Sequence, residues 1–272
     1  MKLLAIDTSG PVAAAALAEE TDGAQKLIAG FRLQSGLTHS ETLMPMTEQM
    51  FSLARIDKKE LDAVAVTAGP GSFTGLRIGV SAAKGLCFAL DLPLVAVPTL
   101  DVIAYQMAGA PGVVCPMMDA RRGQVYTAAY RFSGNEMEQL LTARAVPVEA
   151  LAEELNTMQD AVTLLGDGVP VYLDRMKELL TVPFTVAPVH RDRQSAEALA
   201  ALAFKYLAEG KMVDPASFTP EYLRPSQAER NFPDDGLLIR RAVEAMIDDA
   251  HKAAIGEISS ASYEDVFGRG ND

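Results

Sequence analysis

The feature that most constrains the fold is an order of strand-like and helix-like segments that occurs twice along the chain. Three β-rich segments, at 3–7, 12–18 and 26–33, are separated by turn residues, and helical and strand-like segments then alternate. Three meandering strands followed by such alternation predict a mixed sheet with helices on its faces. After the break at Ala110-Pro111-Gly112 the second half repeats this order. The sequence therefore predicts an α/β protein with two related lobes.

The expected organisation has three parts. Residues 1–109 form a first lobe, 110–232 a second, smaller lobe with a C-terminal helix, and 233–272 a linker and tail. Further strands are expected at 62–68, 94–97, 113–118, 124–132, 140–146, 161–165 and 184–187. Helices are expected at 38–54, 74–90, 99–107, 148–156, 171–180 and 195–209.

Composition and charge argue against several classes of protein. The net charge of −12 repels phosphate backbones, so the chain is not expected to be a main nucleic-acid contact. Cys87 and Cys115 lie in apolar segments and are expected to be buried free thiols of a reducing compartment. His39, His190 and His251 are far apart, which leaves no metal site of the usual Cys/His spacing. Neither a signal peptide nor an uninterrupted membrane span is evident, so a soluble cytoplasmic protein is expected.

Three turns have the residues of a divided phosphate site. Asp7, Thr8 and Ser9 follow the first strand, where hydroxyls and amides can bind phosphate and a carboxylate can bind Mg²⁺ through water. The glycine-rich segment 69–75 joins a strand to a helix, whose N-terminus attracts anions. A second glycine loop, Gly166-Asp167-Gly168, ends a strand in the second half. The alternative at each place is an ordinary turn stabilised by its own side chains.

The helix expected from Thr38 has a possible capping box, Thr38-His39-Ser40-Glu41. His39 would then be a capping or surface residue rather than a catalytic one. Pro45 conflicts with this start because it removes an interior hydrogen bond. Either the helix kinks at Pro45 or it begins at Thr42.

Several motifs together resemble the TsaB (YeaZ) family. They are AIDTSG, THSETLMPM, TAGPGSFTGLRIG, MDARRGQVYTAAY, LLGDG and PEYLRPSQAE, and they occur in this order between Met1 and about Asn231. The resemblance implies an actin-like, sugar-kinase-like fold with a ribonuclease-H-like core. It also implies a non-catalytic, dimerising subunit of the bacterial complex that transfers the threonylcarbamoyl group to N6 of adenosine 37 in tRNAs reading ANN codons.

The resemblance extends to partners and cofactors. The implied partners are the catalytic paralogue TsaD, the ATPase TsaE and a second copy of the chain, with tRNA bound only through the complex. TsaD-like proteins carry a His-x-x-x-His metal pair where this chain has Thr99 and Ile103, and isoleucine has no ligand atom. No catalytic residue, no metal and no tightly bound cofactor are therefore expected, although ATP or ADP with Mg²⁺ could bind at the complex interface. The alternatives are an ATP-dependent phosphotransferase or a metallopeptidase of the same superfamily.

Two helices have more apolar residues than one sheet face can cover, which predicts a partner interface. On the helix 74–90 the surplus flank is Leu76, Val80, Ala83 and Cys87. On the neighbouring helix 42–54 the surplus residues are Met44 and Phe51. The alternative is that the two helices simply pack on each other.

The tail has a separate resemblance. The segment IRRAVEAMIDDAHKAAIGEISSASYEDVF is similar to the opening of RimI-type N-acetyltransferases, which implies a vestigial or truncated fusion. An unrelated amphipathic helix is the alternative. The sequence leaves open whether the chain binds nucleotide alone and whether a homodimer is physiological.

Overall fold

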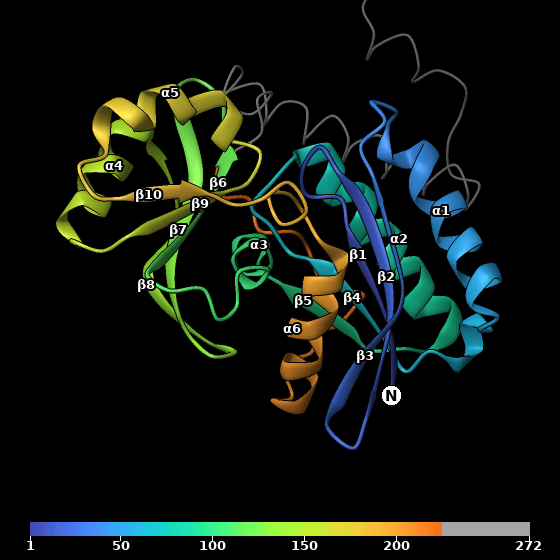
Figure 1. The fold of residues 1–272 in the computed structure, drawn as a ribbon. Helices are drawn as coiled ribbons and strands as arrows, with labels where there is room; N and C mark the ends of the chain where they lie inside the picture. The colour runs from blue at the N-terminus through green and yellow to red at the C-terminus, as the bar shows by residue number, and fades with distance from the viewer. Residues whose placement is uncertain (225–272) are drawn as a thin grey trace, which may run out of the picture. The chain divides into compact units, whose positions relative to one another are not determined.

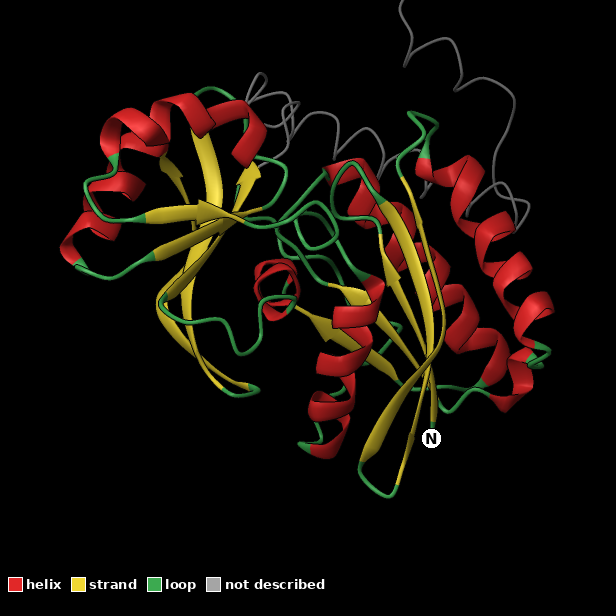
Figure 2. Cartoon of the chain, in the orientation of Figure 1, coloured by secondary structure: helices red, strands yellow, loops and turns green. Residues whose placement is uncertain are grey.

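The computed structural model describes residues 1–224 (Figure 1). The predicted linker and tail, 233–272, and the acetyltransferase resemblance lie outside the described residues. In the described part the chain forms two five-stranded sheets with helices packed on their faces (Figure 2), as the repeated order of segments predicts.

The helices and strands begin and end within a few residues of the predicted positions. The first half contains β1 (Lys2–Asp7), β2 (Ala13–Thr21), β3 (Ala24–Leu33), α1 (His39–Ala54), a short 3-10 helix (Lys58–Glu60), β4 (Ala63–Thr67), α2 (Phe73–Leu90), β5 (Leu94–Val97) and α3 (Thr99–Tyr105). The second half contains β6 (Val113–Asp119), β7 (Gln124–Ser133), β8 (Glu136–Pro147), α4 (Val148–Thr157), β9 (Val162–Leu165), α5 (Val169–Leu179), β10 (Phe184–Val186) and α6 (Ala196–Ala208).

The two sheets have the same topology. The first has the strand order β3-β2-β1-β4-β5 and the second the equivalent order β8-β7-β6-β9-β10. In each, three strands form an antiparallel meander and two more add in parallel to the first strand. The prediction of two related lobes is therefore confirmed.

Alternate residues of β1 point to opposite faces of the first sheet, and each face has its own core. Leu4 and Ile6 pack with α1, whose Met50 is completely buried. Leu3 and Ala5 pack on the other face with α6, which lies on the opposite side of the sheet from α1 and α2 (Figure 1).

The last helix of each half packs on the sheet of the other half. α3 follows the first sheet, but Leu100 and Ile103 pack with Val114 and Tyr130 of the second. α6 follows the second sheet, but its Leu199 and its neighbours are buried on the first. The prediction that the C-terminal helix belongs to the second lobe is therefore wrong, because the apolar residues of α6 are buried on the first sheet.

The segment 211–224 returns to the first lobe. Val213 forms a bridge with Leu94 of β5. The Lys84 Nζ of α2 donates to the Phe218 carbonyl oxygen at 3.0 Å. This Pro-rich segment, assigned to the second lobe from sequence, thus lies along α2 and completes the core around it.

The cap of α1 forms as predicted. The Glu41 carboxylate accepts from the Thr38 N–H at 3.1 Å and from the Thr38 hydroxyl at 2.8 Å. The helix begins at His39 and continues through Pro45 to Ala54, so the alternative start at Thr42 is wrong.

Candidate functional site

The carboxylate predicted to bind Mg²⁺ through water, Asp7, belongs to a hairpin turn that is closed to solvent. Asp7, Thr8 and Ser9 are all buried. Asp7 Oδ1 accepts from the Ser9 N–H at 2.9 Å, from the Ser9 hydroxyl at 2.6 Å and from the Thr67 hydroxyl at 3.0 Å. Its Oδ2 has no partner among the described residues. Burial raises the pKa of Asp7 above its ordinary value, and the bonds from Ser9 and Thr67 oppose that rise.

The first glycine loop packs against this hairpin. The Ser72 N–H donates to the Ser9 carbonyl at 2.7 Å, and the Thr8 hydroxyl donates to the Gly75 carbonyl at 2.7 Å. A Cβ atom built on Gly75 would lie 2.1 Å from the Thr8 carbonyl oxygen. Glycine is therefore required here because helix α2 approaches the hairpin closely, as in the tight-turn alternative.

The second glycine loop is held by the backbone of β6. The Gly168 N–H donates to the Met117 carbonyl at 2.9 Å, and Gly166 has a φ of 108° that favours glycine. Asp167 lies between these two, and burial raises the pKa of its carboxyl.

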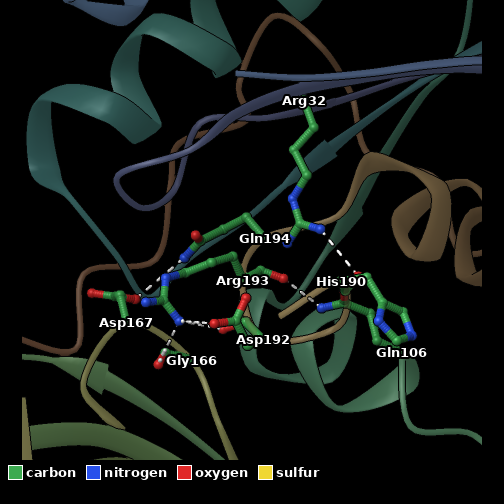
Figure 3. A network of polar contacts seen from close by, with 8 residues as sticks. All are labelled: Arg32, Gln106, Gly166, Asp167, His190, Asp192, Arg193 and Gln194. Carbon is green, nitrogen blue, oxygen red and sulfur yellow. Dashed lines mark hydrogen bonds and ion pairs between the residues drawn. The ribbon is translucent and has the colours of Figure 1, made fainter. Parts of the chain in front are cut away.

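One side chain lies between the first hairpin and the second glycine loop. Gln194 is completely buried, and a Cβ atom built on Gly10 of the hairpin would lie 2.0 Å from its Nε2. The same Nε2 donates to Asp167 Oδ1 of the second glycine loop at 3.4 Å. Figure 3 shows Gln194 beside Asp167, with Arg193 bonded to the Gly166 carbonyl nearby.

The structure thus brings Asp7, Ser9 and the Gly166-Asp167-Gly168 loop to one region, as the hypothesis of a divided site requires. The Gln194 side chain lies between them. Sequence reasoning missed Gln194, because a glutamine in a loop before a helix gives no local signal of its role.

The two positions that correspond to the His-x-x-x-His metal pair of TsaD-like proteins lie in α3. Thr99 and Ile103 are completely buried, and the Thr99 hydroxyl has no partner among residues 1–224. In that same range no three His, Cys, Asp or Glu side chains gather in a way that could hold a metal ion. The expectation that the chain binds no metal stays a prediction.

The predicted interface flank of α2 lies inside the lobe. Leu76, Val80, Ala83 and Cys87 are at most 4 % exposed. They face β4 and β5, and Val213 and Phe218 of the returning segment cover what the sheet leaves open.

Phe51 of α1 is likewise buried, at 4 % exposure, so of the six predicted interface residues only Met44 is exposed. The prediction that the other five form a partner surface is wrong. Burial also raises the pKa of Cys87 to about 11, as befits an inert thiol.

A different surface of the same two helices is open to solvent. A groove of about 550 Å³ lies between the N-terminal halves of α1 and α2. We call it the α1/α2 groove; it is lined by His39, Ser40, Leu43, Met44, Phe73, Thr74, Arg77, Ile78, Ser81 and Ala82.

Met44, 44 % exposed, is the large apolar side chain that the groove presents most openly. One edge of the groove is held by an aromatic cluster: the Phe73 ring lies 4.9 Å from the Tyr222 ring and 4.0 Å from the Arg77 guanidinium carbon. The Arg77 Nε also donates to the Tyr222 hydroxyl at 3.2 Å.

Helix α2 is long and apolar enough to cross a membrane by length and composition alone. In the structure one flank of α2 is buried on the first sheet and another packs towards α1. Its apolar character is therefore explained by packing and by the groove.

Comparison with known proteins agrees with this architecture. The family described as "TsaD: tRNA N6-adenosine threonylcarbamoyltransferase" matches residues 34–232. The tRNA threonylcarbamoyladenosine biosynthesis protein TsaB of Bacillus subtilis is 31 % identical over 84 % of this chain and 96 % of its own length. TsaB of Escherichia coli is also 31 % identical, over 86 % of this chain and 99 % of its own length.

Among solved structures, YeaZ from Pseudomonas aeruginosa is 28 % identical, has a TM-score of 0.67 and covers 81 % of this chain and 99 % of its own. The predicted actin-like class with two ribonuclease-H-like lobes is thereby confirmed. The chain belongs to the TsaB (YeaZ) family of tRNA threonylcarbamoyladenosine biosynthesis proteins.

Proposed function

We propose that the chain is the non-catalytic pairing subunit of a complex that transfers the threonylcarbamoyl group to N6 of adenosine 37 in tRNAs reading ANN codons. The observation that carries this proposal is the position of Gln194, whose side chain lies between Gly10 of the first hairpin and Asp167 of the second glycine loop. A phosphotransferase would need the space between these segments for a nucleotide and would need a carboxylate free to bind Mg²⁺. Here Asp7 is completely buried, and its Oδ1 accepts from Ser9 and from Thr67 of β4.

The catalytic partner in this proposal is TsaD. The family that carries its name matches residues 34–232 of this chain. The metal chemistry that a TsaD-like His-x-x-x-His pair would supply has no counterpart at Thr99 and Ile103. Both side chains are buried and one has no ligand atom, which argues against a metallopeptidase as well.

The α1/α2 groove is the proposed docking surface for TsaD, and for a second copy of the chain when TsaD is absent. Met44 offers an exposed, adaptable apolar contact, while Phe73 and Arg77 form a preformed edge. Aromatic, methionine and arginine side chains are the ones enriched at protein interfaces. These three replace the buried flank that the sequence suggested.

The remaining parts of the proposal follow from the resemblance. TsaE joins the pair as an ATPase, tRNA is bound through the assembled complex, and the complex works in the cytoplasm. The chain alone holds no stoichiometric transition metal and no tightly bound cofactor; ATP or ADP with Mg²⁺ binds, if anywhere, where the subunits meet.

An omission assay tests the proposal. The chain is mixed with TsaD, TsaE, a threonylcarbamoyl donor, ATP and an unmodified tRNA that reads an ANN codon, and each protein is left out in turn. Modification is expected only when the chain and TsaD are both present, and the chain alone should turn over no radiolabelled ATP. Modification by TsaD and TsaE without the chain, or ATP turnover by the chain alone, would overturn it.

A further inference from the structure

The turn between β6 and β7 has a backbone conformation that is unfavourable for two of its residues, Arg121 and Arg122. Arg121, Arg122 and Gly123 have φ angles of 65°, 57° and 73°, all in the left-handed region. Turns with positive φ angles prefer asparagine, aspartate and glycine, because in this conformation the Cβ atom of other residues comes too close to the following carbonyl oxygen. Two consecutive arginines in this conformation therefore indicate a role for their guanidinium groups rather than for the turn.

Asp119, the acidic residue beside these arginines, stabilises the turn through hydrogen bonds. Asp119 Oδ1 accepts from the Arg121 N–H at 2.8 Å and from the Tyr172 hydroxyl at 3.0 Å. The Arg121 guanidinium is 3.6 Å from Asp119 Oδ2, and its side chain is 86 % exposed. Arg122 is exposed and has no ion pair within residues 1–224. An exposed ion pair at that distance leaves most of the positive charge available to another anion.

The equivalent turn in the first lobe has a different environment. Asp7 and Asp119 both end the first strand of their sheet, and both accept from the N–H two residues later. In the first lobe that turn is buried against α2. In the second lobe it is exposed at Arg121 and Arg122, so the duplicated fold presents one positive hairpin turn to solvent.

A third arginine lies at the same turn. The Arg224 side chain donates from an Nη atom to the Ala120 carbonyl at 3.0 Å. Positive charge thus gathers at one place on a chain whose net charge is −12. Ala120 is buried and Gly123 has no side chain, so the turn offers guanidinium groups without an apolar core.

These features favour a phosphate backbone over a protein surface as the partner. Guanidinium groups bind phosphate oxygens in a bidentate manner, and phosphate contacts need no apolar surroundings. Protein interfaces are built around an apolar core, which this turn lacks. We propose that Arg121 and Arg122 bind the sugar–phosphate backbone of the tRNA within the complex, an inference that rests on the proposed function.

The test uses a variant that should fold at least as well as the wild type. Arg121→Asn/Arg122→Gly places preferred residues in the left-handed turn, so the melting temperature should stay or rise. In the pair formed with TsaD, tRNA affinity should fall on the order of tenfold at physiological salt. The slope of log K against log salt should decrease by about 0.7–0.9 for each phosphate that the variant no longer neutralises.

Two further variants serve as controls. Arg55→Asn/Lys59→Gln removes two charges from exposed positions of the first lobe, one of them also left-handed, and should leave tRNA affinity unchanged. Arg121→Lys/Arg122→Lys keeps the charge and should retain most of the salt slope, although lysine cannot bind a phosphate in a bidentate manner.

Four results would overturn the inference. They are unchanged tRNA affinity and salt slope in the Asn/Gly variant, an equal loss in the first-lobe control, loss of TsaD pairing in sedimentation, or loss of radiolabelled ATP binding with tRNA binding intact. The last two would assign the arginines to a protein partner or to a nucleotide. If the wild-type pair fails to support tRNA modification, the proposed function itself fails, which is a separate outcome from equal wild-type and variant activity.

Discussion

Adding one methyl group at Gly10 tests whether Gln194 fills the gap between the lobes. The new Cβ of Gly10→Ala would lie 2.0 Å from Gln194 Nε2 and 2.4 Å from its Cδ, well inside the contact distance of about 3.5–4 Å. The atoms that the new Cβ meets all belong to the Gln194 side chain, so the cost depends on how far this completely buried side chain can shift. Overpacking of this kind costs about 1–3 kcal/mol.

The assay is a double-mutant cycle by urea unfolding. Gly10→Ala is expected to lower the unfolding free energy by about 2 kcal/mol, which corresponds to about 4–8 °C in melting temperature. Gln194→Ala removes the obstructing side chain, so in that background Gly10→Ala should cost less than about 0.5 kcal/mol. The coupling should therefore exceed the roughly 0.3–0.5 kcal/mol within which independent sites usually add. Additive effects, or a harmless Gly10→Ala in the wild type, would refute the filled gap.

Four further substitutions test the core, the groove, the buried carboxyl of Asp7 and the buried hydroxyl of Thr99. Val80→Arg should lower the unfolding free energy by about 3–5 kcal/mol or prevent folding, because it buries an unpaired charge. A well-folded Val80→Arg would speak against the core assignment. Met44→Arg should leave the unfolding free energy unchanged and weaken TsaD pairing in sedimentation. Burial raises the pKa of Asp7 above its unfolded value near 3.8, so its stabilising contribution is full below that pH and is lost as pH rises through the folded pKa. The unfolding free energy of Asp7→Asn minus that of the wild type should therefore increase as pH rises above 3.8, and a difference independent of pH would contradict the shift. Thr99→Val replaces a buried hydroxyl without a partner among residues 1–224 and should be neutral or stabilising by about 1 kcal/mol in urea unfolding; a clear loss would reveal a bond to the hydroxyl.

Most of the secondary structure is predictable because its signals are local. β5 occupies 94–97 as expected, and the Thr38–Glu41 pair marks the start of α1. The repeat of the second half also follows from the order of segments, and it gives the same strand order in both sheets. Local periodicity is enough where each element is bounded by turn residues.

The errors concern contacts between segments far apart in sequence. The flank of α2 around Val80 has an apolar surplus in isolation, but Val213 and Phe218 cover it from a Pro-rich segment without periodicity. The position of α6 is equally hidden, because an alanine-rich helix fits either sheet. The two loops of the predicted site could be inferred from strand ends, whereas Gln194 could not, since only the tertiary fold places its side chain between them.

The most direct test of the account measures the maximal rate of tRNA modification with the inter-lobe carboxyls removed. The double variant Asp7→Asn/Asp167→Asn is titrated into TsaD and TsaE until the rate no longer rises, with pairing followed by sedimentation and folding by urea unfolding. If the chain acts by pairing alone, the saturated variant complex should reach the wild-type maximal rate. A maximal rate lowered tenfold or more, with pairing and folding intact, would show that these carboxyls take part in the chemistry and would contradict the account.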